Sequence, residues 1–184
     1  MITLSPRRFA AAALLRDWLV LPIALLVWVL DQLAKAAIAR WMEFGQSIPE
    51  SGFVHLTYTT NTGGAFGLFP NQSLTLIIAS FLAVGVLLLF YGSRARHNPW
   101  VRLSIGLQLG GAIGNLTDRL VRGYVVDFMH VGPWPVFNLA DSAIVVGLIL
   151  LMAIFLTDTG RPKPVPWPGP PPEWRPDTAP DPGC

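Results

Sequence analysis

Four long apolar stretches, separated by shorter polar ones, set the pattern of this sequence. They cover about residues 18–40, 72–92, 103–122 and 139–157. Each is close to the roughly 18–20 residues that an α-helix needs to cross the hydrocarbon core of a bilayer. We therefore predict an all-α polytopic membrane protein whose four transmembrane helices form a single domain over residues 1–157.

The segment between the first two apolar stretches, residues 41–70, has a different pattern. Polar and hydrophobic residues alternate from Phe53 to Thr60, as is typical of a strand. A glycine-rich turn with Gly63, Gly64 and Gly67 follows. Glycine permits the close approach of backbone to a ligand, but a plain hairpin loop explains the same residues.

Basic residues orient the predicted helices in the membrane. Arg7, Arg8 and Arg16 precede the first helix, and Arg94 and Arg96 follow the second. The first apolar run continues past the length of a signal peptide, so we expect a retained helix. Because positive charge favours the cytoplasmic side of short loops, both termini are predicted to be cytoplasmic.

Composition excludes several classes of protein. Hydrophobic residues make up 52% of the chain and charged residues only 13%, as expected for a protein packed against lipid. A net charge of +2 and the lack of a Lys/Arg-rich run argue against a nucleic-acid partner. The single cysteine, Cys184, excludes an internal disulfide. Residues 158–184 are rich in Pro and Gly, which predicts a disordered cytoplasmic tail.

Charged residues gather between the third and fourth apolar stretches. They are Asp118, Arg119, Arg122, Asp127 and Asp141. Ionisable residues at membrane depth are costly and mark functional sites. On a helix, Asn115, Asp118, Arg119 and Arg122 share one stripe. Asp118 also has a structural explanation, as a local ion pair with Arg119 or a contact at the helix end.

Asp127 and Asp141 lie on either side of a Pro-broken connection. Asp141 occupies the third position of the fourth helix, where it can bind free backbone N–H groups with Asn138 as N-cap. That role leaves Asp127 unexplained. Two adjacent carboxyls share a proton, so that one is an acid and the other a base. Amide hydrolysis through a bound water requires this pairing, so we predict that Asp127 and Asp141 form an aspartyl pair. Asn115, Arg119 and Asn138 are candidates to orient it or to bind substrate carbonyls.

Other interpretations remain open for these polar residues. Asp31 and Lys35 are one helical turn apart and can pair, either as snorkelling residues at the interface or in support of function. Asp127, His130 and Asp141 are conceivable metal ligands, but no metal-binding signature accompanies them. A small proton-coupled transporter also uses intramembrane carboxylates. A transporter favours titratable groups at several depths, whereas here they gather near one face.

Five ordered motifs resemble those of the lipoprotein signal peptidases, or signal peptidase II, the polytopic aspartic proteases of bacterial inner membranes. The motifs are Asp31-Gln32-Leu33-Ala34-Lys35, Asn61-Thr62-Gly63-Gly64-Ala65-Phe66-Gly67, Gly110-Gly111-Ala112-Ile113-Gly114-Asn115-Leu116-Thr117-Asp118-Arg119, Val125-Val126-Asp127-Phe128 and Phe137-Asn138-Leu139-Ala140-Asp141-Ser142. The resemblance covers nearly the whole chain from Trp18 to Leu156. It implies a catalytic dyad of Asp127 and Asp141 without a metal or organic cofactor.

The resemblance also implies supporting residues, a substrate and a location. The supporting or substrate-binding residues are Asn61, Gly63, Asn115, Arg119, Asn138, Ala140, Asp31 and Lys35. The implied substrate is a diacylglyceryl-modified prolipoprotein, cut just before its lipidated cysteine. A small extracytoplasmic β-sheet formed by the segment after the first helix is expected to lie over the site. We expect a monomer in the lipid of the bacterial inner membrane, with its site near the extracytoplasmic face.

Overall fold

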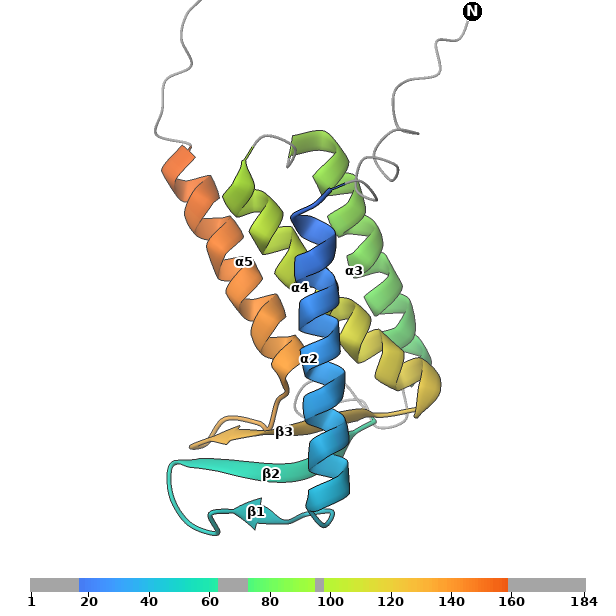
Figure 1. The fold of residues 1–184 in the computed structure, drawn as a ribbon, viewed down its shortest axis with the longest axis vertical. Coiled ribbons are helices and arrows are strands. Elements are labelled where there is room, and N and C mark those ends of the chain that lie inside the picture. The colour runs from blue at the N-terminus through green and yellow to red at the C-terminus, as the bar shows by residue number, and fades with distance from the viewer. Residues whose placement is uncertain (1–16, 63–72, 95–97, 159–184) are drawn as a thin grey trace, which may run out of the picture.

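Four helices and a three-stranded sheet make up the part of the chain that the computed structural model describes, which is residues 17–62, 73–94 and 98–158. The helices are α2 (Val20–Trp41), α3 (Ser73–Arg94), α4 (Pro99–Val121) and α5 (Leu139–Asp158). The strands are β1 (Ser47–Ile48), β2 (Val54–Asn61) and β3 (Val125–Val131). The helices form a bundle, and the sheet lies across one end of it (Figure 1).

The observed helices begin and end within a few residues of the predicted stretches. Among the described residues, two segments, Val20–Trp41 and Leu139–Thr157, are long and apolar enough to cross a membrane, judged by length and composition only. Ile77–Leu87, the part of α3 whose side chains the structure describes, is also apolar. The four helices are thus observed, whereas the crossing of a membrane by all four stays a prediction. The predicted disordered tail lies outside the described residues.

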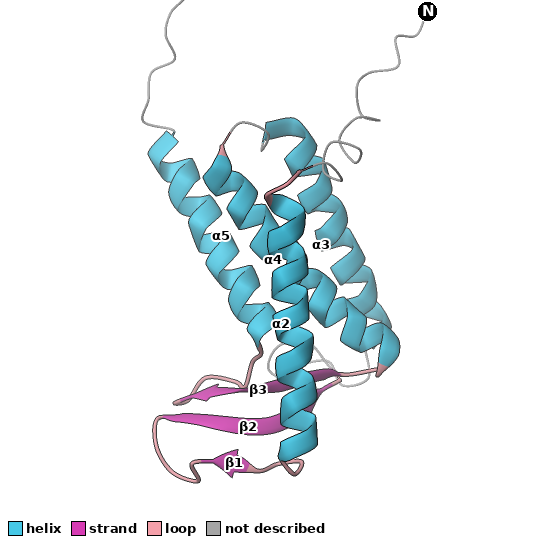
Figure 2. Cartoon of the chain, viewed as in Figure 1, coloured by secondary structure: helices cyan, strands magenta, loops and turns pink. Residues whose placement is uncertain are grey.

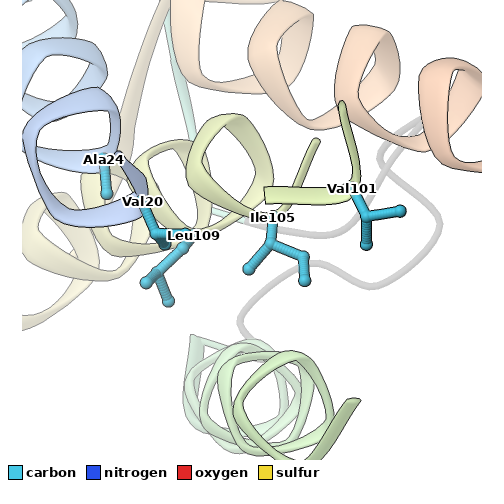
Figure 3. Packing of buried hydrophobic residues seen from close by; sticks show 5 residues of the cluster. All are labelled: Val20, Ala24, Val101, Ile105 and Leu109. Carbon is cyan, nitrogen blue, oxygen red and sulfur yellow. The ribbon is translucent and has the colours of Figure 1, made fainter. Parts of the chain in front are cut away.

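Helix α4 is the centre of the bundle, because it packs against α2, α3 and α5. Small residues permit this close packing. A Cβ atom added at Gly110 would lie 2.6 Å from the carbonyl oxygen of Ala24 on α2. A cluster of buried apolar side chains holds α2 and α4 together (Figure 3). Its members are Val20, Ala24, Val101, Ile105 and Leu109.

The sheet joins two segments that are far apart in the sequence. β1 and β2 come from the predicted β-prone segment, and β3 follows α4 (Figure 2). The strand order is β1-β2-β3, and both pairings are antiparallel. Thr59 pairs with Asp127, and Asn61 pairs with Val125. Since paired residues and residues two apart share a face of a sheet, Asn61 and Asp127 lie on the same face.

Candidate active site

Asp127 reaches the site on β3. Helix α4 ends at Val121, and Gly123 then turns the chain with a left-handed φ of 79°. The β-branched residues Val125 and Val126 favour a strand after this turn. On this strand Asp127 is buried, with only 3% of the residue exposed.

Asp141 reaches the site in the first turn of α5. The predicted N-cap is confirmed, since Asn138 Oδ1 accepts a hydrogen bond from the Asp141 backbone N–H at 2.9 Å. The Asn138 backbone N–H donates in return to Asp141 Oδ2 at 3.2 Å. This reciprocal arrangement resembles a capping box and fixes the Asp141 side chain at the start of the helix.

Two asparagine side chains connect these carboxyl groups. Asn138 Nδ2 donates to Asp127 Oδ1 at 2.6 Å and to Asn115 Oδ1 at 3.1 Å. Asn115 Nδ2 donates to Asp141 Oδ1 at 2.7 Å. The structure therefore brings together Asp127, Asp141, Asn115 and Asn138, which come from β3, α5, α4 and the residue before α5.

Two further predicted residues lie beside the carboxyl pair. The Asn61 side chain hydrogen-bonds to the Asp127 carboxyl group. The Arg119 guanidinium donates to the Ser80 hydroxyl and to the Asn115 carbonyl oxygen, each at 3.4 Å. Its positive charge interacts with both Asp127 and Asp141.

Burial changes the acidity of Asp127. Loss of solvent and, to a smaller extent, the negative charge of Asp141 raise the pKa of Asp127 from 3.8 to about 6. Hydrogen bonds from Asn138 and Asn61 oppose this change. With its pKa near neutral pH, Asp127 is suited to release and recover a proton during a reaction.

Lys35 lies in a fully buried charge cluster next to the pair. Its Nζ atom is 2.8 Å from Asp31 Oδ2, 2.9 Å from Asp118 Oδ2 and 3.0 Å from Asn115 Oδ1. These contacts use all three donors of the ammonium group. The predicted pairing with Asp31 is confirmed. The snorkelling interpretation is wrong, since Asp31 and Lys35 are both 0% exposed.

Asp118 belongs to the same cluster. It forms salt bridges with Lys35 and, at 2.5 Å, with Arg122. The sequence suggested its neighbour Arg119 as the partner, but side chains one position apart on a helix point in different directions. Arg122 follows Asp118 by one helical turn and can therefore reach it.

The two outer carboxylates also hold the backbone beside the central pair. Asp31 Oδ1 accepts the N–H of Ala140 at 3.0 Å, and Asp118 Oδ2 accepts the N–H of Val126 at 3.4 Å. These are the residues immediately before Asp141 and Asp127. The predicted site residue Ala140 thus contributes its backbone, and Lys35 bridges the two carboxylates that hold these segments.

Sequence reasoning did not single out Gln32. Its Nε2 atom donates to Asp31 Oδ2, Asp118 Oδ1 and the carbonyl oxygen of Gly114 at 3.2–3.3 Å. Gln32 directly follows Asp31 in the first of the five motifs, and this position was the sequence feature that could have identified it. Gly63 lies outside the described residues, so its role stays a prediction.

A groove of about 380 Å³ opens beside Asp141. Trp134, Phe137, Asp141, Ser142, Val145 and Val146 line it. Apart from the Asp141 and Ser142 side chains, these residues are apolar. The carboxyl pair is therefore next to a surface suited to a hydrophobic ligand.

The metal interpretation has no geometric support. Among the described residues, no three His, Cys, Asp or Glu side chains gather in a way that suits a metal ion. His130 instead lies beside His55 on the neighbouring strand, with ring centroids 5.2 Å apart.

Comparison with known proteins identifies the family. Residues 23–157 match the sequence model of the family described as signal peptidase (SPase) II. The chain belongs to the signal peptidase II family. Its relatives include the lipoprotein signal peptidase of Moorella thermoacetica, which is 46% identical over 140 residues, or 76% of this chain and 93% of that protein. The lipoprotein signal peptidase of Syntrophomonas wolfei is 46% identical over 139 residues, which cover 74% and 92% of the two chains.

Solved structures agree with membership of the signal peptidase II family. One bacterial membrane enzyme has a TM-score of 0.71 and 34% identity, over 78% of this chain and 90% of its own. A second has a TM-score of 0.68 and 33% identity, over 74% and 91%. A signal peptidase II protein is a hydrolase of the membrane, and these relatives give no support to the transporter alternative.

Proposed function

We propose that this chain is a membrane aspartic endopeptidase that removes the signal peptide from diacylglyceryl-modified prolipoproteins, cutting before the lipidated cysteine. The observation that carries this proposal is the link between Asp127 and Asp141. One residue, Asn138, binds Asp127 through its side chain and Asp141 through its backbone N–H. Family membership supports the lipoprotein substrate.

The reaction requires an acid and a base on opposite sides of the scissile amide. The ionised aspartate accepts a proton from water as the water attacks the carbonyl carbon. The protonated aspartate donates to the carbonyl oxygen. Asn61 hydrogen-bonds to Asp127, and the charge of Arg119 acts on Asp127 and Asp141, which supports a role for both residues in binding substrate carbonyl groups. Neither a metal nor an organic cofactor has a step in this mechanism.

Exposed side chains support a position across the membrane. The 22 residues of α2 span about 33 Å at 1.5 Å per residue, similar to the hydrocarbon core. Exposed tryptophans lie at both ends of the bundle, with Trp18 and Trp100 at one end and Trp41 and Trp134 near the sheet. Tryptophan favours membrane interfaces. In the proposed orientation the sheet is extracytoplasmic and both termini are cytoplasmic.

The apolar groove beside Asp141 supports a substrate that carries lipid. An acyl chain placed there gains from burial against Trp134 and Val146.

Reconstitution in lipid with a synthetic prolipoprotein tests the proposal. We expect cleavage of the diacylglyceryl-modified substrate and little cleavage of the unmodified one. Asp127→Asn and Asp141→Asn are each expected to lose about 10³-fold or more in kcat, because either change removes the acid or the base. Asp17→Asn is the matched control, since Asp17 pairs with Arg102 at the other end of the bundle. Full cleavage by either active-site variant contradicts the dyad, and loss of activity on adding a chelator contradicts the metal-free mechanism.

A further inference from the structure

The contacts of two buried asparagines determine which way their amide groups point. An ammonium group has donors only, so the Asn115 atom 3.0 Å from Lys35 Nζ is the oxygen. Asn115 Nδ2 therefore faces Asp141. Asn138 Oδ1 accepts from the backbone N–H of Asp141, so Asn138 Nδ2 faces Asp127. Amide orientation is often ambiguous, but here a donor that cannot be reversed decides each case.

This polarity affects the two carboxyl groups unequally. Both oxygens of Asp141 face fixed donors, namely Asn115 Nδ2 at Oδ1 and the Asn138 backbone N–H at Oδ2. A proton on either oxygen would point toward one of these N–H donors and break its hydrogen bond. Asp141 also lies at the N-terminus of α5, which favours a negative charge. The structure therefore stabilises Asp141 as a carboxylate.

Asp127 has a different environment. Asn138 Nδ2 donates to one oxygen of its carboxyl group, Oδ1. The other amide partner is Asn61, whose hydrogen bond, like that of Asn138, lowers the pKa of Asp127. Asp127 is also buried, whereas Asp141 is half-buried. Burial penalises the charged form, so the shared proton is more stable on Asp127.

We propose that Lys35 is a positioning residue that, together with Asn138, fixes the direction of the Asn115 amide and so keeps Asp141 ionised as the general base and leaves the shared proton on Asp127. This inference rests on the proposed peptidase function. It assigns the acid and the base, and it gives the buried lysine a role beyond stability.

The assignment gives a balanced reaction. Asp141 takes a proton from water as the new O–C bond forms, and Asp127 gives its proton to the carbonyl oxygen. The product is a neutral gem-diol. The C–N bond then breaks as Asp141 gives its proton to the leaving nitrogen, and Asp127 recovers a proton from a hydroxyl group. Both side chains return to their first state.

The surrounding charges do not reverse this assignment. The charged residues facing the pair are Asp31 and Lys35 on α2 and Asp118, Arg119 and Arg122 on α4. The two acids and two bases in the cluster around Lys35 have no net charge, and the charge of Lys35 itself lowers the pKa of Asp127 by less than burial raises it. Arg119 remains, and its charge acts on both Asp127 and Asp141. The partners contributed by β2 and α3, Asn61 and Ser80, are neutral.

The pH dependence of kcat/KM for prolipoprotein cleavage tests the inference. Asn115→Asp keeps an acceptor for Lys35 but turns a carboxylate oxygen toward Asp141. We expect the acid limb of the profile to move up by about one pH unit or more, because a neighbouring negative charge raises the pKa of the base. If Asp127 were the base, the shift would be well below one unit, since the Asn138 amide lies between the Asn115 and Asp127 side chains. A shift that small, or an unmoved limb, therefore overturns the inference.

A second variant alters the same contact between Lys35 and Asn115 by changing Lys35. Lys35→Met/Asp118→Asn removes one charge of each sign and one of the two donors to Asn115 Oδ1, so that only Asn138 Nδ2 still holds the Asn115 amide. It is expected to move the acid limb in the same direction and serves if Asn115→Asp does not fold. Gln32→Met is the matched control, because Gln32 contacts the same cluster but not Asn115. It should lower thermal stability without moving the limb, and a shift equal to that of Asn115→Asp contradicts the specific role of Lys35.

The outcomes separate this inference from the proposed function. If wild type cleaves the substrate and both aspartate variants do not, the peptidase function stands. An unmoved acid limb in that setting overturns only the roles given to Lys35, Asp127 and Asp141. Absence of cleavage by wild type contradicts the function itself.

Discussion

Lys35→Met is expected to destabilise the fold strongly, because it removes the cation between two buried carboxylates. Lys35 Nζ lies 2.8 Å from Asp31 and 2.9 Å from Asp118, and all three side chains are 0% exposed. Removing one partner of a buried ion pair costs about 3–5 kcal/mol. Asp118 keeps its salt bridge to Arg122, whereas Asp31 keeps only neutral donors. Most of the cost therefore comes from Asp31.

The free energy of unfolding in detergent, measured by circular dichroism during titration with SDS, checks this expectation. Arg122→Met is the comparison, because the Arg122 side chain is 31% exposed and a partly exposed ion pair contributes about 1 kcal/mol or less. Lys35→Met/Asp31→Asn should recover about 1–3 kcal/mol relative to Lys35→Met, since it neutralises the carboxylate left without a cation. Equal losses for Lys35→Met and Arg122→Met, or a double variant less stable than the single one, would refute the reasoning.

Three further predictions concern Asp127, the helix packing and the groove. The pKa of Asp127 is higher in the folded protein than in the unfolded chain, so the protonated form of Asp127 favours the fold. This contribution to stability, about 3 kcal/mol, is present below pH 4 and is lost as the pH rises to about 6. The difference in unfolding free energy between wild type and Asp127→Asn should therefore fall over this range. Gly110→Ala should cost about 1–3 kcal/mol, since its Cβ would meet the Ala24 backbone, whereas Gly85→Ala, with nothing within 4 Å of the new Cβ, should be neutral or stabilising in the same unfolding assay. Val146→Trp should raise KM for the lipid-modified substrate about 10-fold with kcat unchanged, because it fills the groove, while Leu148→Trp, exposed on the same helix but outside the groove, should leave KM as it is.

The local features of this protein follow from its sequence alone. Long apolar runs predict the four helices, because helix formation depends on residues that are close together in the sequence. The Asn138 cap and the pairing of Asp31 with Lys35 join residues three and four positions apart, so spacing is sufficient to predict them. The alternation from Phe53 to Thr60 similarly predicts β2.

Contacts between distant segments were decided only by the tertiary structure. β3 joins β2 across about 70 residues, and this pairing brings Asn61 to Asp127. Spacing indicated neither that pairing nor the burial of Lys35, because both depend on how α2, α4 and the sheet pack. The direction of the Asn115 amide depends on Lys35 and Asp141 together, which come from different helices. A sequence lists the donors and acceptors, but only their positions in space determine which of them meet.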